Sequence, residues 1–124
     1  MSVNTNGINY ELDSLSQTAS VAGNFDSDSG VIAIPSSILY GGISYNVTSI
    51  GEDAFFCCTG LTSITILDRV TSIGKSAFND CIQLSIIRIP KGQKSIFCEE
   101  DRQALQDKFI EYTETLIGNW VKDR

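Results

Sequence analysis

The chain contains no histidine, and this absence removes most of the familiar ways of building an active site. Histidine is the commonest general acid or base and the usual partner of a serine or cysteine nucleophile, so Ser-His-Asp and Cys-His machinery is excluded. The zinc sites that use histidine are excluded with it. The sequence therefore predicts a protein that is not an enzyme and has no catalytic residues, no metal and no cofactor.

Basic residues are missing from the first half of the chain. All nine Lys and Arg residues lie at or after Arg69, whereas seven of the 15 acidic residues precede it, and the net charge is −6. A surface of this sign repels a nucleic-acid backbone and anionic lipids, so we expect neither partner.

Two further absences bear on membranes and on localisation. Long apolar runs are missing, which excludes insertion into a membrane. Residues 1–13 lack the basic start and apolar stretch of a signal peptide, so on these residues alone the protein is expected in the cytoplasm unless an export signal has been removed.

The chain does contain a 23-residue unit written twice in succession. The copies are residues 47–69, VTSIGEDAFFCCTGLTSITILDR, and residues 70–92, VTSIGKSAFNDCIQLSIIRIPKG, and 11 positions are identical. Repeats of this length are typical of solenoids, in which each unit stacks on the next. Equal positions should therefore form ladders through the core: Val47/Val70, Ile50/Ile73, Ala54/Ala77, Phe55/Phe78, Cys58/Cys81, Leu61/Leu84, Ile64/Ile87 and Ile66/Ile89.

The repeats organise the prediction for the whole chain, residues 1–124, as a single domain. Residues 30–92 form the repeats, because residues 30–35 match the tail of a unit and precede the two full copies. Each unit should hold two short extended runs. A glycine (Gly51, Gly74) whose backbone geometry a Cβ would strain closes the first run, and in the first unit a turn of α- or 3₁₀-helix over residues 52–58 follows it. Gly41-Gly42 suits a turn between two short strands.

The two ends should be caps, since terminal solenoid units are atypical. Residues 1–29 predict an N-terminal β-hairpin, because apolar residues alternate over 8–12 and again over 18–23. Residues 93–124 predict a C-terminal helical cap: residues 99–109 begin with acidic side chains, which favour a helix N-terminus, and carry Leu105 and Phe109 on one face. For residues 110–124 the pattern leaves helix and strand open.

The two copies, VTSIGEDAFFCCTGLTSITIL and VTSIGKSAFNDCIQLSIIRIP, resemble the BspA-like leucine-rich-repeat family, whose unit reads approximately VTSIGxxAFxxCxxLxxIxIPxx. The resemblance covers residues 30–92 and implies an α/β leucine-rich-repeat solenoid with short parallel strands and helical or 3₁₀ turns. In function it implies non-catalytic binding or adhesion, at a bacterial surface or in secreted proteins.

The four cysteines allow several interpretations. Cys58 and Cys81 occupy equal repeat positions and suit buried free thiols, although adjacent strands bring such residues close enough for a disulfide. Cys57 has no cysteine counterpart and is expected to be exposed and reactive. Zinc would need paired CxxC spacing, which is missing. Asp26 to Gly30 faintly resembles a calcium loop, but the twelfth position is Ser37 rather than glutamate, so a polar turn is predicted.

The outward faces of the strands are the candidate binding surface. If the paired isoleucines of each unit point inward, alternation places two columns outside: Val31, Ser63 and Ile86, and Ala33, Thr65 and Arg88. This surface is nearly uncharged and partly apolar, which often marks a partner site. We therefore predict binding of a protein or a glycan there. The alternatives are that the C-terminal segment covers this surface, that it is plain sheet, or that it mediates self-assembly into a homo-oligomer.

Overall fold

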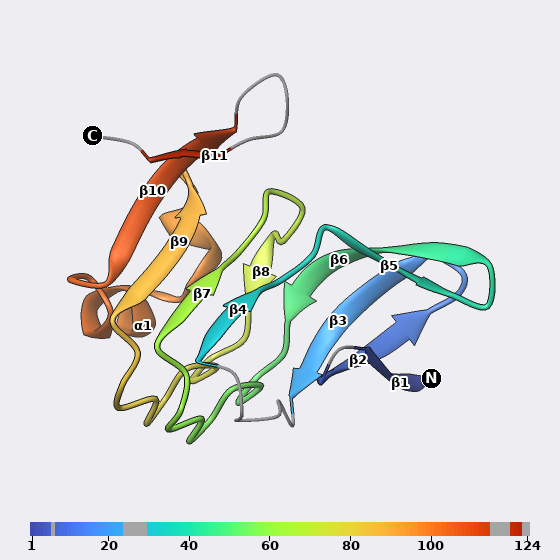
Figure 1. The fold of residues 1–124 in the computed structure, drawn as a ribbon, viewed down its shortest axis with the longest axis horizontal. Coiled ribbons are helices and arrows are strands. Elements are labelled where there is room, and N and C mark those ends of the chain that lie inside the picture. The colour runs from blue at the N-terminus through green and yellow to red at the C-terminus, as the bar shows by residue number, and fades with distance from the viewer. Residues whose placement is uncertain (6, 24–29, 115–119, 123–124) are drawn as a thin grey trace.

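The computed structural model describes residues 1–5, 7–23, 30–114 and 120–122. Its strands form two sheets on either side of a common core (Figure 1). One sheet has the order β1-β2-β3-β6-β5 with β8 beside β6, and the other has the order β11-β10-β9-β7-β4. The elements are β1 (Ser2–Thr5), β2 (Ile8–Asp13), β3 (Thr18–Gly23), β4 (Val31–Ala33), β5 (Ser37–Tyr40), β6 (Ile43–Ile50), β7 (Ser63–Thr65), β8 (Ser72–Ile73), β9 (Ile86–Pro90), η1 (Lys94–Ile96), α1 (Glu99–Ala104), β10 (Phe109–Glu114) and β11 (Trp120–Lys122).

The N-terminal hairpin predicted from the alternating residues is present. β2 and β3 pair antiparallel, and β3 then runs parallel to β6, which joins the hairpin to the repeats. An additional strand, β1, pairs with β2 on the far side. The polar turn predicted from Asp26 lies mostly outside the described residues.

The repeat period sets the register of both sheets. β7 pairs in parallel with β9 through Ile64 and Ile87, and β6 pairs in parallel with β8 through Ile50 and Ile73. Both pairings join residues 23 positions apart, so the second unit stacks directly on the first. The predicted ladder side chains are buried in one core, apart from Cys58, which is half-buried at its margin. The Gly41-Gly42 turn joins β5 to β6, with φ of 60° and 81°.

The predicted helical turn over residues 52–58 is wrong, because this segment consists of successive hydrogen-bonded turns. The N–H of Phe56 bonds back to the carbonyl of Asp53 at 3.1 Å, as in a tight turn. The N–H groups of Phe55 and Cys57 instead bond across to the next unit, to the carbonyls of Ala77 (2.7 Å) and Asn79 (2.9 Å). A helix would keep these donors within its own segment, and here stacking of the units takes them.

The predicted reason for the glycines at positions 51 and 74 also needs correction. Neither Gly51 nor Gly74 has a positive φ. A Cβ on Gly74 would instead lie 2.2 Å from the backbone nitrogen of Glu52, so this glycine is required by the close approach of the two units. The left-handed conformation falls at two other equivalent pairs of positions, where φ is 57–62°: Asp53 with Ser76, and Cys57 with Asp80.

The C-terminal cap contains less helix than predicted. α1 ends at Ala104, and Phe109, expected at the end of that helix, begins β10 instead. β10 runs parallel to β9 and adds another rung to the ladder, and β11 pairs antiparallel with it (Figure 1). The open edge of β9 provides hydrogen-bond partners for the backbone of an extended segment. A short isolated helix gains no such partners and is marginally stable on its own. Of residues 110–124, 115–119 and 123–124 lie outside the described residues.

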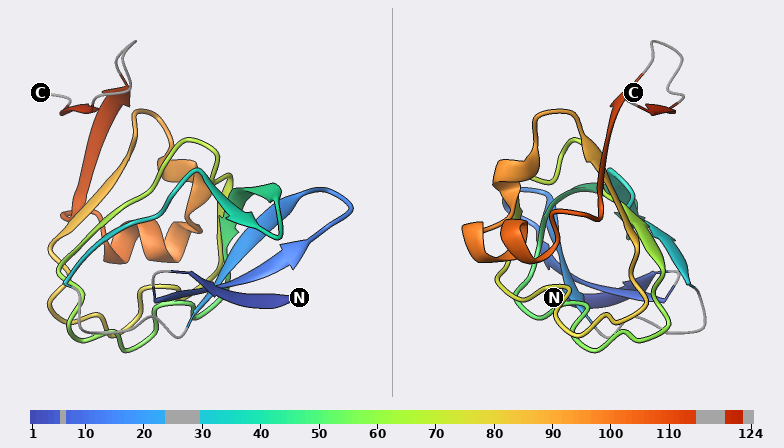
Figure 2. Two further views of the ribbon diagram at one scale, coloured as in Figure 1. Left: turned by 45° about the vertical axis from the view of Figure 1, so that its right-hand side comes forward. Right: turned by 90° about the vertical axis from the view of Figure 1, so that its left-hand side faces the viewer.

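Phenylalanine side chains continue the core from the repeats into the cap. The rings of Phe55 and Phe78 are stacked, with centroids 5.4 Å apart and an interplanar angle of 3°. Phe97 follows at 6.1 Å from Phe78, and Phe109 lies edge-on to Phe97 at 5.0 Å. The Phe55/Phe78 pair is the predicted ladder. Phe97 and Phe109, which belong to the cap, extend it beyond the repeats. In the right-hand view of Figure 2 the successive units nearly overlap, and α1, in orange, lies at one side of them. In the described part of the chain, no helix is long and apolar enough to cross a bilayer.

Candidate binding groove on the five-stranded sheet

Four neighbouring strands of the five-stranded sheet place their outward side chains in one row. Ala33 of β4 pairs in register with Thr65 of β7, which pairs with Arg88 of β9. Arg88 in turn pairs with Ile110 of β10. The row formed by Ala33, Thr65, Arg88 and Ile110 therefore crosses the sheet at right angles to the strands, and we call it the cross-strand row.

The cross-strand row lies in a groove of about 650 Å³. Its remaining lining residues are apolar or aromatic: Ile34, Pro35, Leu67 and Tyr112. Tyr112 is 4% exposed, and its hydroxyl donates a 2.5 Å hydrogen bond to the carbonyl of Ile66, which follows β7. Because β9 lies between β7 and β10, the side chain of Tyr112 extends across β9 to make this bond. The volume is in the range of sites that take a small ligand or a few side chains of a partner.

Three of the six residues predicted for the binding surface line the groove, namely Ala33, Thr65 and Arg88. Val31, Ser63 and Ile86 form a parallel row outside it. Val31 is 65% exposed, whereas Ser63 is only 8% exposed, so its predicted exposure is wrong. Its short side chain lies in register between the larger Val31 and Ile86 on the neighbouring strands.

Sequence reasoning missed the part of the groove that β10 supplies. Ile110 and Tyr112 alternate with Glu111 along this strand, which is the period of a half-buried strand and could have indicated it. Pro35 and Leu67 occupy equivalent positions of the repeat. Each lies two residues beyond the second predicted column, in which Ala33 and Thr65 stand. The C-terminal segment does not lie over the cross-strand row in the described residues: β10 extends the sheet, and α1 bonds to the turns through Asp101, which accepts the N–H of Ser76 at 3.0 Å.

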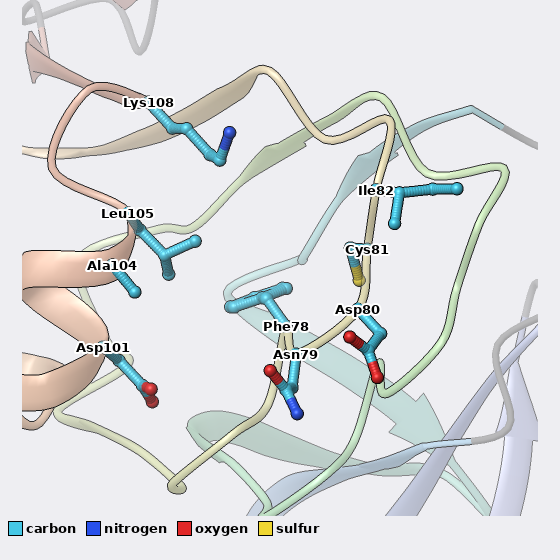
Figure 3. A pocket seen from close by; sticks show the side chains of 9 residues that line it. All are labelled: Phe78, Asn79, Asp80, Cys81, Ile82, Asp101, Ala104, Leu105 and Lys108. Atoms are coloured by element: carbon cyan, nitrogen blue, oxygen red, sulfur yellow. The ribbon is translucent and has the colours of Figure 1, made fainter.

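A smaller pocket of about 260 Å³ lies between α1 and the turns of the second unit (Figure 3). Phe78 and Leu105 face each other across it, and the charged groups of Asp80 and Lys108 lie at its rim (Figure 3). Cys81 donates its thiol hydrogen to the carbonyl of Phe55 at 2.9 Å. Burial raises the pKa of this thiol to about 11, which keeps it protonated at neutral pH.

The other thiols are also free, so no Cys58–Cys81 disulfide is present. Cys57 is exposed, as predicted, but desolvation and then the neighbouring carboxylate of Asp80 raise its pKa, which opposes formation of a reactive thiolate. Within residues 1–5, 7–23, 30–114 and 120–122, no three Cys, Asp or Glu side chains gather as metal ligands would. The groove is thus the arrangement in the described structure that is best suited to holding a ligand.

Comparison with known proteins identifies the repeat. The profile of the BspA type leucine rich repeat region (6 copies) matches residues 34–107. The chain belongs to the BspA-type leucine-rich-repeat family. The resemblance inferred from residues 30–92 is therefore confirmed, and the family match extends through α1. Membership of this leucine-rich-repeat family suggests a repeat module that binds proteins.

Several solved structures share this fold. A leucine-rich repeat protein from Bacteroides capillosus is 33% identical with a TM-score of 0.65, over 71% of this chain and 64% of that one. A leucine-rich repeat protein from Bacteroides ovatus is 35% identical with a TM-score of 0.65, over 71% of this chain and 23% of that one. A leucine rich cell surface protein from Faecalibacterium prausnitzii is 27% identical with a TM-score of 0.67, over 90% of this chain and 30% of that one.

This BspA-type chain thus spans less than two thirds of the length of each of these three relatives. A comparison with curated proteins finds no match.

Proposed function

We propose that this chain is a non-catalytic binding module that holds a segment of a protein partner in the groove on its five-stranded sheet. The observation that carries the proposal is the groove itself, which runs along the cross-strand row and whose lining includes the half-buried apolar side chains of Pro35, Leu67 and Ile110. Apolar side chains of a partner would lose their contact with water there, which favours association.

A protein segment suits this groove better than a glycan does. Sugar hydroxyls need hydrogen-bond partners when they are buried, and the apolar part of the groove provides few of them. Attachment to a partner also fits an adhesion role, and one relative of this chain is named a cell surface protein. We extend the proposal to adhesion on that basis.

The test uses two variants of the same strand. Ala33→Trp fills one end of the groove, whereas Val31→Trp places the same side chain on β4 outside it. A displayed library of random linear peptides and a glycan array are both applied to the purified chain. We expect peptides that lose at least tenfold in affinity with Ala33→Trp and keep their affinity with Val31→Trp.

Two results would contradict the proposal. Peptides that bind both variants equally would place the binding surface elsewhere. Glycans that bind the chain and are lost only with Ala33→Trp would assign the groove to a different class of partner.

A second function, self-assembly, is favoured by the hairpin of β5 and β6. β5 ends the six-stranded sheet, and Leu39, Tyr40 and Ile43 at the hairpin tip are 72%, 44% and 40% exposed. An apolar edge strand of this kind invites pairing with a second copy of the chain. Light scattering coupled to size exclusion should then show a dimer that Leu39→Lys dissolves, and a monomer of about 13.5 kDa at every concentration would exclude it.

A further inference from the structure

Among the described residues, the groove is lined by one charged side chain, Arg88, and that side chain is not paired there. Within the described residues it makes no ion pair and no side-chain hydrogen bond. It is also half-buried, between Thr65 and Ile110 of the neighbouring strands. Five guanidinium donors beside an apolar surface are thus left to water or to a ligand.

Three other basic side chains of the described structure have partners. Lys75 pairs with Glu100 at 3.8 Å, Arg69 donates a hydrogen bond to Asn46, and Lys94 lies 5.8 Å from the ring centroid of Phe109. Within the described residues the side chains of Arg102 and Lys108 also make no ion pair and no side-chain hydrogen bond, so what distinguishes Arg88 is its place in the groove.

The nearest acidic residue in register does not compensate Arg88. Glu111 follows Ile110 on β10, so strand alternation sends its side chain to the opposite face from the cross-strand row. The carboxylate of Glu111 accepts a hydrogen bond from the N–H of Gly92 at 2.8 Å, so this acidic group is engaged away from Arg88. An anion that neutralises Arg88 therefore has to come from outside this part of the structure.

The length of the cross-strand row limits the size of that ligand. Four strands span three gaps of about 4.8 Å, which is about 14 Å in total. An extended segment rises about 3.3 Å per residue, so about four or five residues would cross the row. Arg88 lies one strand from the β10 end and two strands from the β4 end, so a segment filling the row has residues on both sides of its contact with Arg88.

From these observations we propose that the groove recognises an extended protein segment by one internal acidic side chain, bound to the Arg88 guanidinium, with apolar residues on either side. This inference rests on the proposed function. A guanidinium binds a carboxylate through two parallel hydrogen bonds, which gives both orientation and strength. The chain's net charge of −6 disfavours a polyanion, so the recognised segment carries a single acidic side chain among apolar ones.

The test is a library of capped linear heptapeptides with randomised flanks and either Glu or Gln fixed at the centre. With the unmodified chain we expect central Glu to be favoured over Gln by at least tenfold. Arg88→Gln should abolish this preference, and Arg88→Lys should keep part of it because the charge remains while the fork is lost. Arg69→Gln is the matched control, outside the groove, and should leave the preference unchanged.

The outcomes separate this inference from the proposed function. Peptides that are blocked by Ala33→Trp but show no Glu preference would overturn the role of Arg88 and leave the groove as the binding surface. A preference for uncapped peptides that end in a free carboxylate would overturn the internal position of the acid. Absence of any peptide whose binding depends on Ala33 would overturn both. Circular dichroism and thermal unfolding of each variant check that the fold is retained.

Discussion

Truncation of Phe78 tests whether the aromatic ladder holds the repeats and the cap together. Phe78 is 5% exposed and lies between the rings of Phe55 and Phe97, at centroid distances of 5.4 and 6.1 Å. A phenylalanine buries about 200 Å², which at about 25 cal/mol per Å² corresponds to an upper value of about 5 kcal/mol. The Cβ retained in Phe78→Ala lowers this value, and we expect a loss of about 3–5 kcal/mol in the free energy of unfolding.

Urea unfolding followed by circular dichroism measures this loss. With a denaturant slope of about 2 kcal/mol per M, the midpoint should fall by about 2 M. Phe56→Ala is the matched control, because Phe56 belongs to the same turn segment as Phe55 but is 47% exposed, and its loss should stay below about 1 kcal/mol. Phe78→Leu keeps more of the volume and provides a folded variant if Phe78→Ala does not fold.

A double-mutant cycle isolates the stacking itself. Coupling between Phe55→Leu and Phe78→Leu should be about 0.5–1.5 kcal/mol, the usual value for an aromatic pair. Equal losses for Phe78→Ala and Phe56→Ala would refute the assignment of Phe78 to the core. A coupling of zero would refute a specific contribution from the stacked geometry.

The equivalent glycines should differ in tolerance: Gly74→Ala places a Cβ 2.2 Å from the backbone nitrogen of Glu52 and should cost about 3 kcal/mol or more, whereas Gly51→Ala meets only the Val21 carbonyl at 3.1 Å and should cost less than half of that. Equal urea midpoints for the two variants would contradict the close approach. Burial raises the pKa of Tyr10 from 10.0 to about 12, so its neutral form contributes stability that is complete below pH 10 and is lost as pH rises toward 12. The loss should reach about 2 kcal/mol, and Tyr10→Phe should lack this component in urea titrations at pH 9 and 11.5; parallel pH dependences of the two proteins would disprove it.

The repeat and the ladders that follow from it could be predicted from the spacing of identical residues alone. A 23-residue period with equal apolar residues permits one stacking register, because a shift would place polar positions such as Asp53 against buried ones such as Phe55. Strand alternation then identified Ala33, Thr65 and Arg88 as a column facing outward, since a side-chain period of two leaves no other choice once the isoleucines are buried.

The remaining features depend on contacts between segments, which the residue pattern of one segment does not reveal. The turn segment forms no helix because the N–H groups of Phe55 and Cys57 bond to carbonyls of the adjacent unit. Helix propensity describes a segment alone and does not include such partners. Phe109 begins a strand because the edge of β9 is available to it. Ser63 is buried although strand alternation places it in the outward column, and its neighbours in register are Val31 and Ile86. The groove is completed by β10, which pairs with β9 although residues 109–114 do not carry the repeat pattern, and which places Ile110 in register with Arg88 and Tyr112 in register with Pro90.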